Sequence, residues 1–134
     1  MSEDQIGETV VAEAPDSAAI ALSEQGDTAV VRLRGPLDAA LTRSLGDALT
    51  WAVNHHSAVF VDLSAVPAVD PFGLGALVRA QHRAVGMGTA LCLVAPSQPV
   101  LKALRALRLD DVFAVVDNVP AAFPGGVPAR TGRP

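Results

Sequence analysis

Asp70-Pro71-Phe72-Gly73-Leu74 is the stretch that decides the fold, because it joins an apolar strand pattern at residues 58–63 to the start of an amphipathic helix. Asp70 is placed as an N-cap whose carboxylate can accept from the free amides of the first turn. Pro71 then falls at the first helical position, where a missing N–H costs nothing. Open α/β folds place their functional sites on loops at the carboxyl ends of strands. We therefore expect this loop to carry the function, although the side chains of Pro71 and Phe72 are chemically inert.

The composition is that of one small domain. The chain has 134 residues, of which 50% are hydrophobic, and this suffices for a single core. Its net charge is −4 and its basic residues are scattered, which disfavours nucleic-acid binding because that needs clustered Lys and Arg. No apolar run reaches the roughly 20 residues that cross a bilayer, and the acidic N-terminus lacks the pattern of an export signal. We expect a cytoplasmic protein that binds neither nucleic acid nor membrane.

Two polar ends flank the candidate domain. Residues 1–17 carry acidic side chains and no basic one, whereas residues 124–134 are rich in Pro and Gly. Both compositions predict disordered tails. The folded domain is therefore expected at residues 18–123.

Strand and helix patterns alternate within this domain. Apolar runs at 19–22 and 29–33 flank a polar turn and predict a hairpin. Leucines at helical spacing then predict a packing helix that Asp38 caps and that ends near His55.

The second half of the domain continues the alternation. Helices are expected after the caps Asp70 and Ser97, the first of them stopping at Gly86. The remaining elements are expected as strands at 58–63, 89–94 and 112–116 and a short helical turn at 119–123. Helical crossovers impose parallel pairing, so the fold class is α/β, with a mixed, mostly parallel sheet of about five strands and about four helices.

The histidines do not predict a metal site. The chain has three, His55, His56 and His82. His55 and His56 are adjacent, so they point in different directions, and a helix C-terminus favours their solvated, charged form. His82 lies on the polar side of its helix and is expected at the surface.

Other candidate groups have simple structural explanations. Asp62 and Asp70 could do general acid–base work as a pair, but they are better explained as a strand-end residue and a helix cap. Gly73 and Gly75 open a helix after a strand, yet the third glycine of a dinucleotide site is absent. Cys92 lies in an apolar run and is expected to be buried and inert. We expect neither enzymatic activity nor a cofactor.

Five segments follow one another in the order and spacing of a known family. They are VVRLRGPLD at 30–38, VDLS at 61–64, DPFGLG at 70–75, LCLVAPS at 91–97 and LDDVF at 109–113. Together they resemble the STAS domain, which is named for sulfate transporters and anti-sigma factor antagonists. Residues 70–75 are similar to its signature Asp-Ser-Ser/Thr-Gly-Leu-Gly, and the resemblance covers nearly the whole domain.

The resemblance implies a protein-binding switch and not an enzyme. In antagonists of this family, the signature loop and the helix after it dock on an anti-sigma factor with a serine-kinase ATPase fold, which frees the sigma factor. The kinase phosphorylates the hydroxyl residue just before the signature glycine, and the added charge and bulk break the complex. In this sequence Phe72 occupies that position and Pro71 the preceding serine position, so neither can accept phosphate.

Several interpretations of the loop remain. The chain is an antagonist that its kinase cannot switch off, with Phe72 as an apolar anchor, or it is a scaffold or dimerisation module bound to other STAS proteins or to itself. Alternatively, Phe72 turns inward and the loop serves folding alone. Nucleotide or anion binding at the helix start is a minor alternative. An exposed Phe72 would favour an interface, whose residues would then be Asp70, Pro71, Phe72, Gly73, Leu74 and Arg79.

Overall fold

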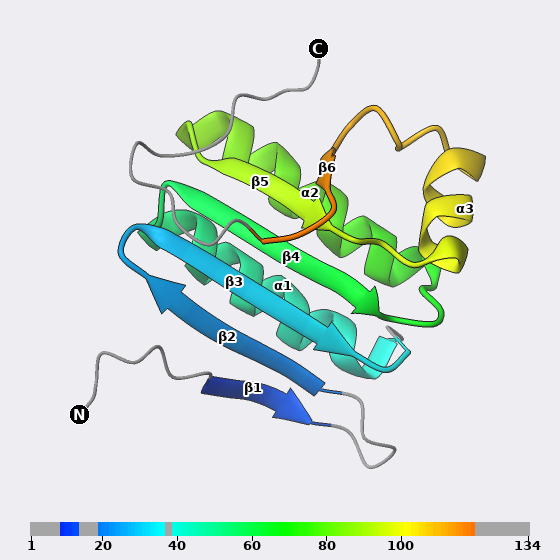
Figure 1. The fold of residues 1–134 in the computed structure, drawn as a ribbon, viewed down its shortest axis with the longest axis horizontal. Coiled ribbons are helices and arrows are strands. Elements are labelled where there is room, and N and C mark those ends of the chain that lie inside the picture. The colour runs from blue at the N-terminus through cyan, green and yellow to red at the C-terminus, as the bar shows by residue number, and fades with distance from the viewer. Residues whose placement is uncertain (1–8, 14–18, 37–38, 120–134) are drawn as a thin grey trace.

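A six-stranded sheet with the strand order β1-β2-β3-β4-β5-β6 forms the frame of the domain (Figure 1). The structure is a computed structural model, and it describes residues 9–13, 19–36 and 39–119. The strands are β1 (Thr9–Glu13), β2 (Ala19–Gln25), β3 (Thr28–Arg34), β4 (Ala58–Ala65), β5 (Ala90–Val94) and β6 (Ala114–Val116). The helices within these residues are α1 (Ala39–His55), α2 (Pro71–Met87) and α3 (Gln98–Ala106).

The pairing of the strands confirms the predicted mixed α/β sheet. The first three strands pair antiparallel, and β3, β4, β5 and β6 pair parallel. β2 and β3 form the predicted hairpin, in which Gln25 pairs with Thr28, so that Gly26 and Asp27 make the turn. Gly26 has a φ of +60°, which a glycine adopts without strain.

The strand β1 corrects one expectation. Residues 1–17 were expected to form a disordered tail, but residues 9–13 pair antiparallel with the edge of β2, with Thr9 opposite Leu22. Thr9, Val10 and Val11 are β-branched and suit a strand, and the acidic composition of the whole segment hid this short run. Because of β1, the sheet has six strands instead of the predicted number of about five. The predicted tail at 124–134 and the cap Asp38 lie outside the described residues.

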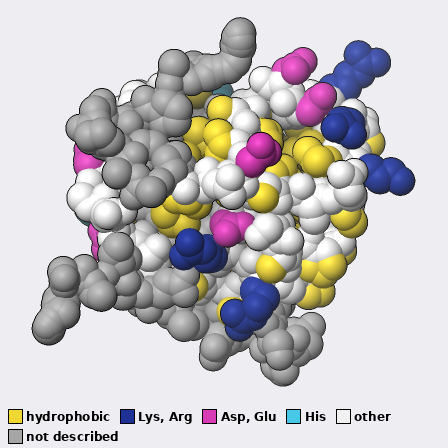
Figure 2. All heavy atoms as spheres, viewed as in Figure 1, with side chains coloured by type: hydrophobic (Ala, Val, Ile, Leu, Met, Phe, Trp, Pro, Cys, Tyr) yellow, Lys and Arg dark blue, Asp and Glu magenta, His cyan; other side chains and the backbone are white. Residues whose placement is uncertain are grey.

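Two clusters of buried side chains lie on the two faces of the sheet. The larger lies between the sheet and the pair α1 and α2, which cover the same face (Figure 1). Its fully buried large side chains include Ile20, Leu45, Leu49, Leu63, Leu77 and Leu93. The smaller consists of Val30, Ala58, Phe60, Cys92 and Val94, which alternate along the strands with residues of the larger cluster. Figure 2 shows this second face, where hydrophobic side chains lie among separated charged ones. Cys92 is buried, as predicted.

Several predicted helix ends differ from the observed ones. α2 begins at Pro71 as expected but passes through Gly86 and ends at Met87. Gly88 is its C-cap, and its φ of +73° is the left-handed conformation typical of a helix end. Ser97 occupies the N-cap position of α3 without a side-chain cap bond, because its hydroxyl donates to the Val66 carbonyl instead. The described residues contain three helices, whereas about four were predicted. Of the helical turn expected at 119–123, only Val119 lies within the described residues, and it is not helical.

Candidate functional site

The loop before α2 has the geometry that its sequence predicts. The Gly73 amide donates to Asp70 Oδ1 at 2.9 Å, and the Leu74 amide donates to the Asp70 carbonyl at 3.1 Å. Asp70 is therefore the N-cap of α2, and Pro71 follows it in the first turn. Gly73 and Leu74 are buried, so they anchor the helix start to the core.

Phe72 points outward from this fixed start. Its exposure is 66%, whereas Leu74 is 4% exposed. The interpretation in which Phe72 turns inward to fill space under the helix is therefore wrong. An aromatic ring in this position gains little from packing within the chain and is accessible to a partner.

The start of α2 is poorly suited to hold an anion. Such a site needs several backbone N–H groups aimed at the ligand. Pro71 has none, and the amides of Gly73 and Leu74 already donate to Asp70. The carboxylate of Asp70 would in addition repel a phosphate at the same place. These contacts disfavour the nucleotide or anion alternative.

A groove between α1 and α2 includes Phe72 in its wall. We call it the α1–α2 groove, and its volume is about 740 Å³. Its lining residues are Thr42, Arg43, Gly46, Asp47 and Thr50 from α1 and Phe72, Ala76, Arg79, Ala80, His82 and Arg83 from α2. Arg79, which the sequence placed in the candidate contact surface, thus lies in the same groove as Phe72. Sequence reasoning missed Arg43, Asp47 and Arg83, because only the packing of α1 beside α2 brings them there.

The two candidate carboxylates serve separate structural roles. Asp62 Oδ1 accepts from the Ser64 amide at 3.0 Å and from the Ser64 hydroxyl at 2.7 Å. Its other oxygen lies 3.5 Å from Nε of Arg32 on the neighbouring strand β3. Asp70 caps α2. The expected bond of Asp62 to the backbone is confirmed, but Asp62 lies inside β4 and not at its end. Nothing in these contacts favours acid–base work by the pair.

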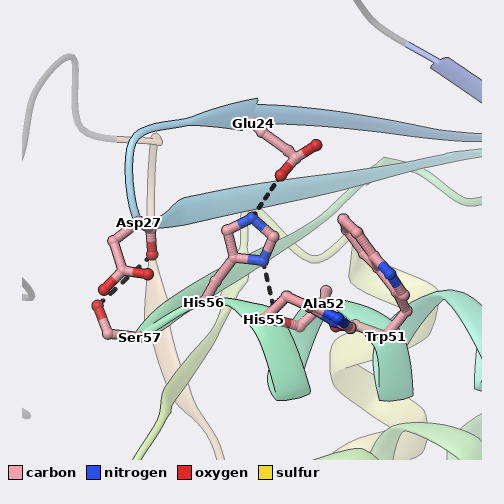
Figure 3. A network of polar contacts seen from close by, with 7 residues as sticks. All are labelled: Glu24, Asp27, Trp51, Ala52, His55, His56 and Ser57. Carbon is pink, nitrogen blue, oxygen red and sulfur yellow. Dashed lines mark hydrogen bonds and ion pairs between the residues drawn. The ribbon is translucent and has the colours of Figure 1, made fainter.

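His56 contradicts the expectation that both adjacent histidines are solvated. Figure 3 shows its ring between Glu24 of β2 and the last turn of α1. The side chain is 3% exposed, with Nε2 at 2.7 Å from Glu24 Oε1 and Nδ1 at 3.0 Å from the Ala52 carbonyl. His56 therefore ties the end of α1 to the hairpin. His55 is exposed as predicted and stacks on Trp51, with 4.6 Å between ring centroids.

Neither a metal cluster nor a membrane span is found in the part of the chain that the structure describes. No group of three or more His, Cys, Asp or Glu side chains lies close enough to hold a metal ion among these residues. Their helices are also too short or too polar to cross a membrane. His82 is exposed, as its helical position predicts.

The chain belongs to the STAS family. The model of the STAS domain matches residues 19–122, which include every described helix and the sheet apart from β1. The family resemblance that the sequence patterns indicate is thereby confirmed.

Solved structures of anti-sigma factor antagonists share the fold. One from Mycobacterium paratuberculosis is 25% identical with a TM-score of 0.69, covering 81% of this chain and 92% of that one. A candidate antagonist from Thermotoga maritima is 21% identical with a TM-score of 0.68, covering 73% and 86%. The Bacillus antagonist SpoIIAA in its unphosphorylated form is 19% identical with a TM-score of 0.65, covering 72% and 87%. This chain is therefore a STAS domain whose structural neighbours include anti-sigma factor antagonists.

Proposed function

We propose that the chain is an anti-sigma factor antagonist that binds an anti-sigma factor of the serine-kinase ATPase fold through the start of α2. The observation that carries the proposal is Phe72, a 66% exposed aromatic ring on a loop that the Asp70 cap holds in place. Rigid aromatic side chains that become buried at the centre of an interface often contribute most of its binding energy. The proposed contact surface consists of Asp70, Pro71, Phe72, Gly73, Leu74 and Arg79.

Some of these residues would contact the partner, and the others fix the conformation of the loop. Phe72 and Arg79 are exposed and supply contacts, as does Pro71 in the first turn. Asp70 fixes the backbone, and the buried Gly73 and Leu74 keep the helix start against the core. The surface is preformed, so binding orders few groups and loses little conformational entropy.

The proposed antagonist lacks the usual phosphorylation switch. Neither Pro71 nor Phe72 carries a hydroxyl, so the kinase has no acceptor at the position before Gly73. The hydroxyls of Ser64 and Ser97 are already engaged, since Ser64 donates to Asp62 and Ser97 donates to the Val66 carbonyl. The partner kinase then has no means of releasing itself by modifying this loop.

A scaffold or dimerisation module is the second candidate. Its support is a pair of exposed apolar side chains at the other end of α2, Val85 at 70% and Met87 at 50% exposure. Such residues suit contact with another STAS protein or with a second copy of this chain. This role predicts self-association or STAS binding that depends on Val85 and Met87 and not on Phe72.

Binding measurements separate the two candidates. The full chain is titrated calorimetrically into purified anti-sigma factors of the kinase fold, together with the variants Phe72→Ala and Val85→Ala. Both substitutions remove an exposed apolar side chain from α2, so they are matched. We expect Phe72→Ala to weaken binding about 30-fold, as for an interface anchor, and Val85→Ala to leave it unchanged. Failure of every anti-sigma factor to bind the unmodified chain would contradict the antagonist proposal.

A further inference from the structure

We propose that the α1–α2 groove binds an acidic segment of the partner protein, so that the contact extends from Phe72 along both helices. The charged side chains in the groove are Arg43, Arg79 and Arg83, opposed by Asp47 alone. The chain as a whole has a net charge of −4, so this positive excess is local to the groove. Complementary charge favours the approach and the correct orientation of a negative partner surface. The identity of the partner rests on the proposed function, whereas the charge of the segment rests on the groove itself.

The backbone of α2 makes room for one of these arginines. Nη1 of Arg79 lies 3.2 Å from the point that a Cβ on Gly75 would occupy. The guanidinium therefore lies back over the first turn of α2, toward the end of the helix that carries Phe72. A side chain at position 75 would require the guanidinium to shift by a few tenths of an ångström. Gly75 thus leaves room for Arg79 in this position.

Arg83 is held in the groove in a different way. Its Nε donates to Asn54 Oδ1 at 2.8 Å, which links α2 to α1. A guanidinium has five N–H donors, so this bond fixes the group and leaves donors that suit a carboxylate. Hydrogen bonds between guanidinium and carboxylate are shorter and stronger than neutral ones.

The groove also offers space for apolar groups of a ligand. Ala76 and Ala80 are 2% and 6% exposed, and a Cβ on Gly46 would meet nothing within 4 Å. These small residues leave space beside the ring of Phe72. A volume of about 740 Å³ suits a short peptide segment. The ligand expected is therefore a segment that carries glutamate or aspartate next to leucine-like side chains.

A model peptide tests the groove without the partner. The probe is a synthetic helical peptide with glutamates and leucines on one face, and its control has glutamine in place of glutamate. Each is titrated into the isotope-labelled full chain, and the amide shifts are followed by NMR. We expect the acidic peptide to shift the amides of residues 43–50 and 72–83, and the glutamine peptide to bind about tenfold more weakly.

Variants of the chain test separately how the charge and the shape of the groove contribute to peptide binding. Arg43→Gln, Arg79→Gln and Arg83→Gln should each weaken the acidic peptide about twofold, and together about tenfold, because exposed ion pairs are individually weak. Arg105→Gln removes an exposed arginine from α3 and is the matched control, which should change nothing. Gly46→Leu keeps the charge but fills the open space, and it should abolish binding. Circular dichroism checks that each variant is folded.

Three outcomes would overturn the inference. Equal binding of the acidic and glutamine peptides would refute the role of charge, and shifts confined to other regions or absent altogether would refute the groove. Concentration-dependent shifts of the groove amides in the peptide-free chain would assign it to a second copy. Titration of Gly46→Leu into an anti-sigma factor that binds the wild type then tests the same surface in the complex. The peptide titration needs no anti-sigma factor. Its result can therefore refute peptide binding in the groove without refuting the antagonist function, and the antagonist function can be refuted without refuting peptide binding.

Discussion

Replacement of Phe72 by alanine tests whether its side chain packs in the core or is free to contact a partner. The ring is 66% exposed, so folding removes only about a third of it from water. Complete burial of a phenylalanine side chain contributes about 1.5–3 kcal/mol, which leaves about 0.5–1 kcal/mol for this one. Alanine is also the better helix former by about 0.5 kcal/mol, and this offsets part of the loss. We expect Phe72→Ala to lower the free energy of unfolding by less than about 1 kcal/mol.

The matched comparison is Leu74→Ala, two residues further along the same helix. Leu74 is 4% exposed, and truncation of such a core residue costs about 2–5 kcal/mol. Urea unfolding followed by circular dichroism measures both variants, with an unchanged slope showing that the unfolding transition is comparable. A loss above about 2 kcal/mol for Phe72→Ala would mean that the ring is part of the core. The assignment of Phe72 to a contact surface would then be refuted.

Three further predictions concern stability and use the same unfolding assay. Asp70→Ala should lower the free energy of unfolding by about 1 kcal/mol because it removes the cap on the Gly73 amide. An unchanged free energy of unfolding would show that the cap contributes nothing. Gly86→Ala should stabilise by about 0.5–1 kcal/mol, since Gly86 lies inside α2 with open space around its Cα; destabilisation would contradict the observed length of the helix. His56→Ala should lower the free energy of unfolding by about 2 kcal/mol or more through lost packing and the lost side-chain hydrogen bonds to Glu24 and Ala52, and an unchanged value would place His56 in solvent.

The sequence predicts those features that depend on neighbouring residues. The start of α2 follows from Asp70 and Pro71 alone, because a cap and a first-turn proline act within one helical turn. The apolar pattern of 58–63 likewise identifies β4, a strand with buried residues on both faces. The end of α2 was misplaced because Gly86 and Gly88 are both suitable stops, and only the backbone shows which one is left-handed.

Features that depend on distant parts of the chain could not be predicted. His56 is buried because the hairpin lies over the end of α1 and brings Glu24 to it from 32 residues away. The α1–α2 groove likewise arises from the packing of two helices, and its arginines look like ordinary surface residues in the sequence. The sequence leaves the exposure of Phe72 open, since a ring at a helix start can turn either way until the packing beneath it is known.

The central claim is that this STAS domain binds its partner kinase and cannot be released by phosphorylation of the loop. The most direct measurement incubates the full chain with an anti-sigma kinase that binds it, first with ADP and then with ATP. Size-exclusion chromatography follows the complex, and intact mass spectrometry follows the chain. The account predicts that the complex persists in ATP and that the mass of the chain is unchanged. Gain of a phosphate on the chain together with loss of the complex would contradict it.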